Sequence, residues 1–551
     1  MNGNYNHVSV LIVGAGPAGL SAAITLKKAD PQAEVCVVDK SAGPGFHNLS
    51  GAVLEPPALH RLLDMASPQW AESEPAKKVL HKVTRDDVLF LWGKSMSFNI
   101  SWAIGMAKSL GLGFGQMTHH GDYLCSASQL TVWLTQIART LGVEVLQGFS
   151  VEDIHWDGTI ATGVKLVDRG LNKEGHKNRN YAAGETVTAD MIILAEGCDG
   201  LVTEKFIEKA GLKRANSQLY SVGVKELIKV SDEQYKSFGE GRVVHAMGYP
   251  IWSPIIGPSM FGGGIMYAMG DNKIAVGMIV GLDWKPCDFN PQDALTQFKN
   301  HAFVKPFIDQ GQAVEAGAKM IPEGGFHALP RDPQTQNIGK ANVMILGDSA
   351  GFVNMLKIKG LHNAIESGMA SGKTAFQCIK NPADAASEYT RQLEQSGVLK
   401  EMESAANFRQ AVARFGPLQG MPLSVLGRCL PNFHCEPDYK EMTRGKYRLK
   451  PRLKFDKDTF TAIAATEHGE EEPCHLHILH PEICQKQCTP KFGGPCITFC
   501  PAGVYEQVQT IVKAANPSNC LHCKTCQRKC PFDNIRWTVP EGSGGPRYKM
   551  M

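Results

Sequence analysis

The 551-residue sequence predicts an α/β protein, in which a doubly wound sheet carries an inserted mixed β-sheet and is followed by a small, cysteine-rich α+β domain. Three observations support this prediction. Residues 8–13 have the pattern of a buried strand, 17–28 of a helix and 35–39 of a second strand, which together begin a βαβ unit. Further candidate strands follow much later in the chain. Eight of the sixteen cysteines lie between residues 484 and 530.

The later strand candidates indicate that the first domain is assembled from separated segments. Strands are predicted at 143–148, 190–197 and 342–351, and β-like, glycine-rich sequence over 260–280 is assigned to the inserted sheet. The chain then becomes helical and basic from about residue 386 to 450.

Residues 451–473 have the proline and charge content of a linker. Four units are therefore expected, namely the first segments of the nucleotide-binding domain with inserted pieces (1–220), the mixed sheet (221–335), the last segments with a helical region (336–465) and the cysteine-rich domain (466–551).

Composition excludes several classes of protein. A net charge of +3 with 43% hydrophobic and 20% charged residues is typical of an ordinary folded protein, so no nucleic-acid partner is expected. The sequence has no run of 18 apolar residues and no secretion-signal pattern, which predicts a cytoplasmic protein that does not span a membrane. The C-terminal part has a more positive charge than the rest of the chain, because the sequence from Cys474 onward contains nine Lys or Arg and four Asp or Glu.

A glycine motif opens the first predicted helix. Gly14, Gly16 and Gly19 follow a strand, and Asp39 ends the next strand twenty residues later. In such a motif the first glycine permits a tight turn, the second admits a pyrophosphate, the third allows close helix packing and the acid accepts from a ribose. The pattern predicts dinucleotide binding; the alternative is a simple glycine-rich turn.

A second segment favours FAD as that dinucleotide. Gly347 and Asp348 lie at the end of a predicted strand, where they suit the far end of a long, extended cofactor. A helix after Gly360 would direct its N-terminus at the flavin ring and stabilise negative charge there. No second glycine motif of this kind follows a strand, so NAD(P)H is not expected as an electron donor.

The cysteine spacing predicts an iron–sulfur cluster. Cys520, Cys523, Cys526 and Cys530, the last before a proline, have the spacing of bacterial ferredoxins, in which the close triplet binds one four-iron cluster. Cys500, also before a proline, would complete that cluster. The alternative, a zinc ribbon, needs paired CxxC knuckles and does not explain the third cysteine.

A second cluster is also expected. Cys496 and Cys500 repeat the spacing of Cys526 and Cys530, so the first half of the domain resembles a stretched copy of the second. By this pseudo-symmetry Cys530 would join three upstream cysteines. The alternative is that these four are spare buried thiols. The possible second set is Cys484, Cys488, Cys496 and Cys530.

These residues resemble the electron transfer flavoprotein–ubiquinone oxidoreductase family, and also a flavoprotein and ferredoxin-like pair associated with electron flow to nitrogenase, here joined in one chain. The resemblance covers most of the sequence. It is carried by GAGPAGLSAA at 14–23, FGGGIMY at 261–267, EGGFHALP at 323–330, GDSAGFVNMLKIKGLHNAIESG at 347–368, FCPAGVYE at 499–506 and the CLHCKTC run.

The resemblance implies a membrane-associated oxidoreductase on the cytoplasmic side of the inner membrane. It would accept single electrons from reduced electron transfer flavoprotein and pass them through FAD and a 4Fe-4S cluster to ubiquinone or menaquinone. It also implies that Asn363 lies near the flavin ring and that the quinone meets the backbone near Gly263 and Gly281. The first cluster would be bound by Cys500, Cys520, Cys523 and Cys526; the second cluster is an addition to the family plan.

Two surface features bear on partners. Apolar stretches at 102–117 and 413–431 are too short to cross a bilayer but suit an interface, although the first could equally be a core helix or a lid. Lys524, Arg528 and Lys529 lie inside or beside the cluster loop and predict a docking site for a partner of opposite charge.

Two rival functions remain open. Geranylgeranyl reductases share the glycine motif and the general fold, but they offer no reason for the cysteine-rich end. The other rival is an electron-delivery module that feeds a low-potential acceptor in a larger complex, which an extra cluster would suit.

Overall fold

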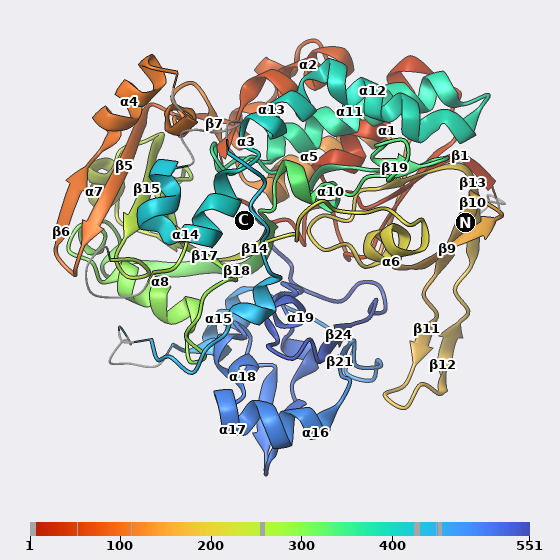
Figure 1. The fold of residues 1–551 in the computed structure, drawn as a ribbon. Helices are drawn as coiled ribbons and strands as arrows, with labels where there is room; N and C mark the ends of the chain where they lie inside the picture. Colours follow the sequence, from red (N-terminus) through yellow and green to blue (C-terminus); the bar gives the residue numbers. More distant parts are fainter. Residues whose placement is uncertain are drawn as a thin grey trace.

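The structure is a computed structural model with three domains. The predicted nucleotide-binding domain, a second sheet domain and the cysteine-rich domain pack around a common centre (Figure 1). The predicted fold is confirmed. The structure describes residues 7–51, 53–111, 113–253, 259–423, 430–447, 449 and 455–551.

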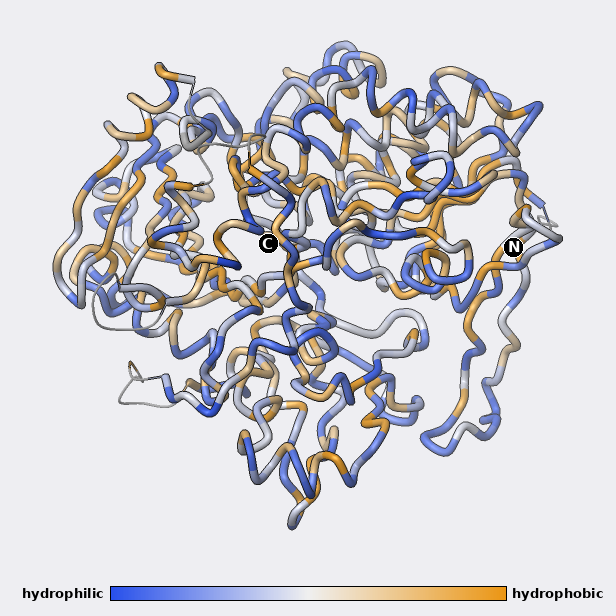
Figure 2. Tube along the Cα trace, viewed as in Figure 1, coloured by the Kyte–Doolittle hydropathy of each residue, from blue (hydrophilic) through white to orange (hydrophobic). Residues whose placement is uncertain are grey.

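The first sheet is built around strand β1 (His7–Val13), which lies between β2 (Val35–Asp39) and β13 (Thr186–Leu194), all parallel. Leu11 pairs with Cys36 on one side. Figure 2 shows that hydrophobic residues concentrate along these strands. The parallel array continues to β20 (Val343–Ile345) and β8 (Glu144–Gln147), and β19 (Gly339–Lys340), β10 (Ile160–Leu166) and β9 (Val151–Asp157) add antiparallel strands.

Helices cover the upper face of this sheet in Figure 1. Helix α1 (Pro17–Ala29) packs tightly against α11 (Leu361–Cys378), because Gly368 and Gly372 leave room for the opposing backbone. A Cβ on Gly368 would lie 2.3 Å from the carbonyl oxygen of Ala18. The layer also contains α2 (Pro56–Ala66), α5 (Ala127–Thr140), α12 (Ala385–Ser396) and α13 (Val398–Ser404).

The second sheet has seven strands and lies on the left of Figure 1. Its strands run antiparallel except where β15 and β5 pair in parallel, so the sheet is mixed. Two of the strands come from the early part of the chain, within the predicted 1–220 unit. In spatial order they are β18 (Gln312–Pro322), β14 (Tyr220–Lys229), β17 (Lys273–Gly281), β16 (Gly262–Ala268), β15 (Arg242–Gly248), β5 (Arg85–Trp92) and β6 (Met96–Asn99).

The cysteine-rich end forms a separate domain at the bottom of Figure 1. It has two antiparallel strand pairs and several short helices around buried thiols. Its core is continuous with that of the second sheet domain through residues such as Trp284 and Phe499, whose rings lie 5.9 Å apart. The strand pairs are β21 (Leu476–Ile478) with β24 (Ile535–Trp537) and β22 (Tyr505–Val508) with β23 (Ile511–Ala514).

Two local predictions need correction. The predicted strand 342–351 ends at Ile345, because the chain turns at Gly347, whose φ of +51° starts the short helix α10 (Gly347–Ala350). The predicted linker 451–473 contains helix α15 (Lys457–Ile463), which begins where Asp456 accepts hydrogen bonds from two backbone N–H groups. Residues 451–454 lie outside the described residues.

Candidate functional site: two adjoining cavities and two sets of thiols

The three glycines of the motif differ in the space around them. Gly14 has φ +109°, and a Cβ there would lie 2.3 Å from the carbonyl oxygen of Ala195. A Cβ on Gly19 would lie 2.1 Å from the carbonyl oxygen of Gly14. At Gly16, by contrast, the one atom of the described residues within 4 Å of a Cβ would be Asn48 Nδ2, at 3.6 Å, and the residue lines a large cavity. Gly16 therefore leaves space that a ligand can occupy.

Asp39 stands at the edge of the same cavity. Its Oδ2 accepts a hydrogen bond from Ala15 N at 2.8 Å, and its Oδ1 accepts one from Ser41 N at 2.8 Å. These bonds fix the carboxylate beside the loop that precedes α1. A glycine cradle, a helix N-terminus and a fixed carboxylate together fit the phosphates and ribose of a dinucleotide.

The second predicted segment reaches the other part of the cavity. Asp348 and Gly360 line it, and burial raises the pKa of Asp348 to about 6, although the charge of Lys319 opposes this rise. Gly347 is not among the described residues that line the cavity; a Cβ on it would lie 3.1 Å from Ala18 Cβ. Gly347 therefore serves close packing against α1, as Gly19 does.

Asn363 is buried, and it is not among the described residues that line the cavity. Its Nδ2 donates to Glu401 Oε1 at 3.2 Å. The neighbouring residues Leu361 and Ala364 line the cavity instead. The first turn of α11 therefore contributes its backbone and apolar side chains at this position.

A second cavity adjoins the first. The two share lining residues, among them Ile265 and Ile279, and the second is mainly apolar. Gly263 lines this second cavity. Gly281 is not among the described residues that line either cavity, and a Cβ on it would lie 2.7 Å from Arg409 Nη2. The second cavity suits a flat, apolar ligand.

The eight clustered cysteines are all buried and fall into two sets. In the first set the pKa of Cys520 is raised by burial and then by the neighbouring charges of Cys523, Cys526 and Cys500. Four converging thiols suit a four-iron cluster. Among the described residues, the groups of His, Cys, Asp or Glu whose ligand atoms lie within 4.8 Å of one another contain none of these thiols, which argues against a single tetrahedral zinc ion.

The second set also converges. Burial, followed by the charges of Cys530 and Cys484, raises the pKa of Cys488 to about 12. The pKa of Cys496 is raised by burial, then by the charges of Cys530, Cys488 and Cys484, and last by that of Cys526 of the first set. Asn534 contributes to this set, because its Nδ2 donates to Cys484 Sγ at 3.4 Å and its backbone N donates to Cys530 Sγ at 3.4 Å. Hydrogen bonds to sulfur are one means by which proteins tune cluster potentials.

The cationic residues beside the cluster loop are not an exposed docking patch, and that prediction was wrong. Lys529 is fully buried, and its Nζ donates to the carbonyl oxygens of Trp284 at 2.8 Å and Asp438 at 3.0 Å. Lys524 is 6% exposed and donates to the carbonyl of Asp199; Arg528 forms an ion pair with the Asp199 carboxylate. These cations join the cysteine-rich domain to the other two domains.

Some cavity residues carry no local sequence signal. Lys225, Lys319 and Tyr267 line the first cavity, and His245 and Glu323 line the second. All five lie on or next to strands of the second sheet, whose face toward the cavity depends on strand pairing across the whole domain. A prediction of that pairing would have been needed to find them.

Comparison with family models and with known proteins gives a consistent result. Residues 451–549 match a model described as electron transfer flavoprotein-ubiquinone oxidoreductase, 4Fe-4S, and residues 220–321 match one described as ETF-QO, ubiquinone-binding. Residues 12–82 match an NAD(P)-binding Rossmann-like domain.

Relatives that match along nearly their whole length are also named electron transfer flavoprotein-ubiquinone oxidoreductase. The mitochondrial electron transfer flavoprotein-ubiquinone oxidoreductase of Oryza sativa is 34% identical over 98% of this chain and 92% of its own length. The protein of the same name in Pseudomonas aeruginosa is 32% identical over the full length of both chains.

Among solved structures, a geranylgeranyl bacteriochlorophyll reductase-like protein of Thermoplasma acidophilum superposes with a TM-score of 0.53 at 17% identity, covering 77% of this chain and 91% of that one. A myxobacterial chondrochloren halogenase gives a TM-score of 0.50 at 16% identity, covering 74% of this chain and 82% of its own. At these identities the likeness concerns the fold alone.

Proposed function

Because this chain belongs to the electron transfer flavoprotein–ubiquinone oxidoreductase family, we propose that it takes electrons from reduced electron transfer flavoprotein and passes them, through FAD and iron–sulfur centres, to a quinone. It is an oxidoreductase with FAD and 4Fe-4S chemistry. FAD, when bound, supplies the means to exchange electrons one or two at a time.

The observation that supports this function best is the contact between the three sites. The dinucleotide cavity shares Ile265 and Ile279 with the apolar cavity. It is also lined by Lys524, which directly follows Cys523, a predicted cluster ligand. Electron centres placed in these sites would be neighbours, as transfer between them requires.

Several residues would bind and orient the flavin cofactor. The loop containing Gly14 and Gly16 would take the pyrophosphate at the N-terminus of α1, and Asp39 would take the adenosine ribose. The backbone at Gly360 would present the N-terminus of α11 to the flavin ring, where the positive end of the helix dipole stabilises negative charge. Gly19 and Gly347 would support the flavin site indirectly, by allowing close packing around α1. Asn363 would also support it indirectly, through its hydrogen bond to Glu401.

The quinone would occupy the apolar cavity. Gly263 would contact it there, whereas Gly281 would act by leaving space for Arg409. Arg409 forms ion pairs with Asp283 at 2.9 Å and with Glu323 at 2.8 Å. The second pair fixes Glu323, which among the described residues is the one acidic side chain that lines both cavities. Ubiquinone and menaquinone both suit this lining.

The two thiol sets would bind two clusters. The first would use Cys500, Cys520, Cys523 and Cys526, and the second Cys484, Cys488, Cys496 and Cys530. Convergence of the second four thiols supports this assignment over spare buried cysteines, because unrelated thiols need not gather in a set of four.

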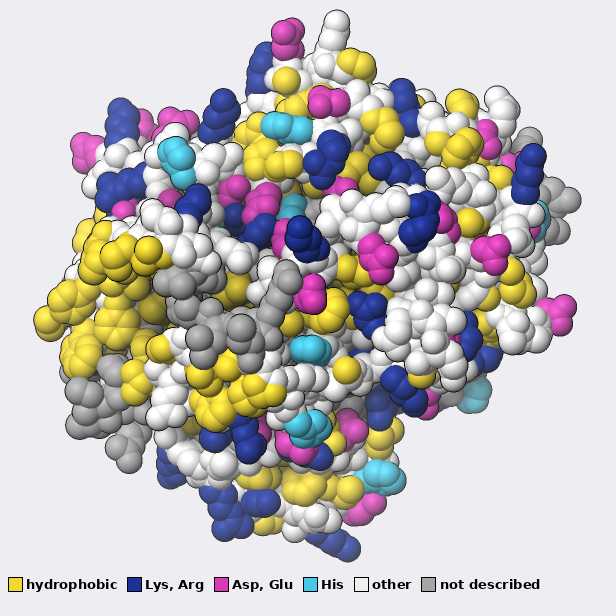
Figure 3. Space-filling view, turned by 45° about the horizontal axis from the view of Figure 1, so that its top comes forward, with side chains coloured by type: hydrophobic (Ala, Val, Ile, Leu, Met, Phe, Trp, Pro, Cys, Tyr) yellow, Lys and Arg dark blue, Asp and Glu magenta, His cyan; other side chains and the backbone are white. Residues whose placement is uncertain are grey.

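The protein would contact a membrane surface through an apolar patch on the left of Figure 3. Helix α4 (Ser101–Ser109) overlaps the predicted 102–117 stretch, and of its described residues only Ile104 is buried. This exposure favours an interfacial helix over a core helix. The patch consists of Trp92, Met96, Phe98, Trp102, Met106 and Leu110, and Phe415 and Leu418 of the 413–431 stretch are also exposed.

The second apolar stretch, 413–431, is described only in part. Residues 424–429 of the second apolar stretch lie outside the described residues. Within the described part of the chain, the helices are too short or too polar to cross a bilayer.

We place the protein on the cytoplasmic side of the inner membrane because thiolate-bound clusters suit a reducing compartment.

Anaerobic mixing with reduced electron transfer flavoprotein and a short-chain ubiquinone tests the function. FAD and cluster absorbance should bleach, and quinol should then form at one per two electrons supplied. A chain that is reduced but never forms quinol would favour the electron-delivery module. A chain that saturates isoprenoid double bonds instead would favour the reductase.

A further inference from the structure

The apolar cavity has a histidine in its wall. His245 is 6% exposed, and its Nε2 shares a hydrogen bond of 2.8 Å with the hydroxyl of Tyr267. Tyr267 lines the first cavity, the one proposed to hold the dinucleotide, whereas His245 lines the apolar cavity. Its Nδ1 has no hydrogen-bond partner within the described part of the chain. A buried nitrogen of this kind is costly unless water or a ligand pairs with it.

A second buried histidine lies behind the first. The rings of His119 and His245 are 4.6 Å apart, and neither ring nitrogen of His119 has a hydrogen-bond partner among the residues described. Asp86 completes the group, because its Oδ2 accepts from His119 N at 2.7 Å while its Oδ1 is buried and unpartnered in the described structure. One ligand atom from each of the three lies within 4.8 Å of the others, so a single water could bridge them.

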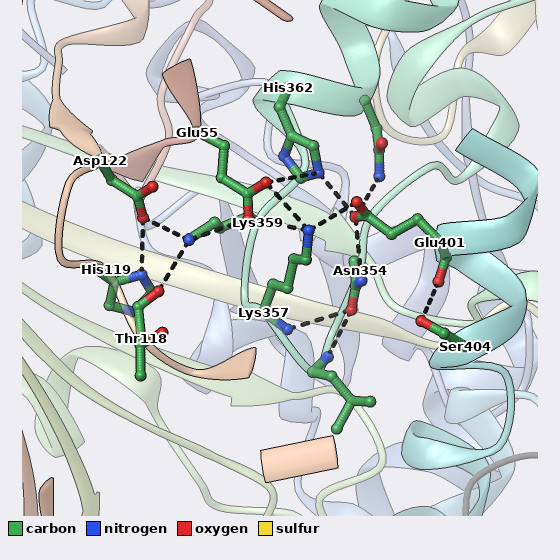
Figure 4. A network of polar contacts seen from close by, with 12 residues as sticks. Glu55, Thr118, His119, Asp122, Asn354, Lys357, Lys359, His362, Glu401 and Ser404 are labelled. Atoms are coloured by element: carbon green, nitrogen blue, oxygen red, sulfur yellow. Dashed lines mark hydrogen bonds and ion pairs between the residues drawn. The ribbon is translucent and has the colours of Figure 1, made fainter. Parts of the chain in front are cut away.

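A chain of charged groups runs from His119 through Asp122 and Lys359 to Glu55 (Figure 4). His119 Nδ1 lies 3.5 Å from Asp122 Oδ2, which accepts from Lys359 Nζ at 2.5 Å. Lys359 also bonds Glu55 at 3.2 Å, and the Glu55 side chain is 22% exposed. The Lys359 side chain is only 2% exposed, so this is a buried path that ends at solvent.

We propose that Glu55, Lys359, Asp122, His119 and His245, with Asp86 beside them, form a relay that carries protons from solvent to the quinone cavity. The proposal rests on the proposed function, since it assigns a role at the same cavity. Reducing a quinone to its quinol adds two electrons, which the redox centres supply, and two protons, one to each oxygen. Those protons come from water, and the apolar cavity lining has few groups that could deliver them.

The protonation properties of the trio suit this task. Burial raises the pKa of Asp86 to about 6, so its carboxyl can carry a proton near neutral pH. Burial, followed by the charge of Lys359, lowers the pKa of His119 to about 3, and burial followed by His119 and Lys359 lowers that of His245. Neutral imidazoles can accept a proton on one nitrogen and release one from the other.

A divalent metal is the competing occupant of the trio. Two imidazoles and a carboxylate are a familiar ligand set. The ammonium group of Lys359 already places positive charge beside Asp122 and His119, which disfavours a second cation there. The relay is therefore the assignment that the surrounding charges favour.

His119→Asn tests the relay, with His120→Asn as the matched control, because His120 is the next residue and is exposed. Dithionite-reduced enzyme is mixed with a short-chain ubiquinone in weak buffer with a pH indicator. In His119→Asn, quinol formation and proton uptake should both slow about 10- to 100-fold, as expected when a positioned acid–base group is lost. Imidazole should restore part of the rate, and the solvent deuterium effect should rise.

A second variant and two binding measurements guard against misfolding. Asp86→Asn keeps an oxygen for the His119 N–H and should show the same slowing. The affinity of the oxidised enzyme for a quinone analogue, and its FAD and iron content, should match wild type in both variants.

Three results would overturn the proposal. If wild type forms no quinol at all, the proposed function fails and the relay fails with it. If wild type forms quinol and His119→Asn and Asp86→Asn do so at the same rate, the relay alone is wrong. A stoichiometric metal that His119→Asn loses would assign the trio to metal binding.

Discussion

Replacing Gly16 with valine should weaken FAD binding without destabilising the folded chain. Within the described part of the chain, a Cβ at this position meets Asn48 Nδ2 alone within 4 Å, at an ordinary contact distance of 3.6 Å. The side chain would therefore fit the protein and fill the space that a pyrophosphate needs. At Gly19, by contrast, a Cβ would lie 2.1 Å from the carbonyl oxygen of Gly14, so Gly19→Ala must shift the backbone.

The size of the effect follows from the contact that is lost. One hydrogen bond from the loop to a charged phosphate contributes about 1.5–3 kcal/mol. Its loss alone would raise the Kd for FAD by about 10- to 150-fold. The valine side chain also excludes the pyrophosphate sterically, so we expect the Kd for FAD to rise by at least about 10-fold.

Titration of FAD into the apoprotein, followed by flavin fluorescence, measures the Kd. Thermal unfolding of the same apoprotein separates the two glycines, since Gly16→Val should unfold near the wild-type temperature and Gly19→Ala below it. Iron content should be unchanged in Gly16→Val. Stoichiometric, tightly bound FAD in Gly16→Val would refute the assignment of this loop to the pyrophosphate.

Three further results are expected. A fully reconstituted chain should hold about eight irons, and Cys530→Ser about four, because each four-iron cluster takes four thiolates; iron and sulfide analysis measures both. Lys529→Glu should lower the free energy of unfolding by about 3–5 kcal/mol, since it leaves buried acceptors without their cation; urea unfolding measures this loss. Trp102→Asp with Met106→Asp should reduce binding to liposomes, because 70% of Trp102 and 54% of Met106 are exposed in the apolar patch.

Each of these has a matched control. Cys474→Ser, outside both thiol sets, should keep all the iron, and a wild-type chain with only four irons would contradict the second cluster. Lys513→Glu, on an exposed part of the same domain, should leave stability unchanged, and equal stability of Lys529→Glu would contradict its buried role. Phe376→Asp, an exposed apolar site elsewhere, should bind liposomes as wild type does.

Local sequence patterns could predict the parts of the fold that depend on neighbours in the chain. The first βαβ unit was predicted nearly to the residue, because short apolar runs and a glycine turn are local properties. The thiol sets were predicted from spacing alone. The contrast among Gly14, Gly16 and Gly19 also follows the roles that the motif assigns to them.

Properties that depend on packing between domains could not be predicted in this way. Lys524 and Lys529 have the sequence pattern of a solvated charged face, yet both are buried where the cysteine-rich domain meets the other domains. His119 and His245 lie more than a hundred residues apart in the sequence. The parallel pairing of β5, which carries Asp86, with β15, which carries His245, helps to bring them together. No local pattern marks either residue as part of a common site.

Steady-state quinol formation tests the central claim most directly. Wild-type chain, loaded with FAD and iron–sulfur clusters, is supplied with reduced electron transfer flavoprotein and ubiquinone, and compared with Met421→Trp, which fills the apolar cavity. We expect wild type to form one quinol per two electrons. Met421→Trp should still be reduced by electron transfer flavoprotein but should form little quinol. Full quinol formation in Met421→Trp, or none in wild type, would contradict electron transfer to a quinone in this cavity.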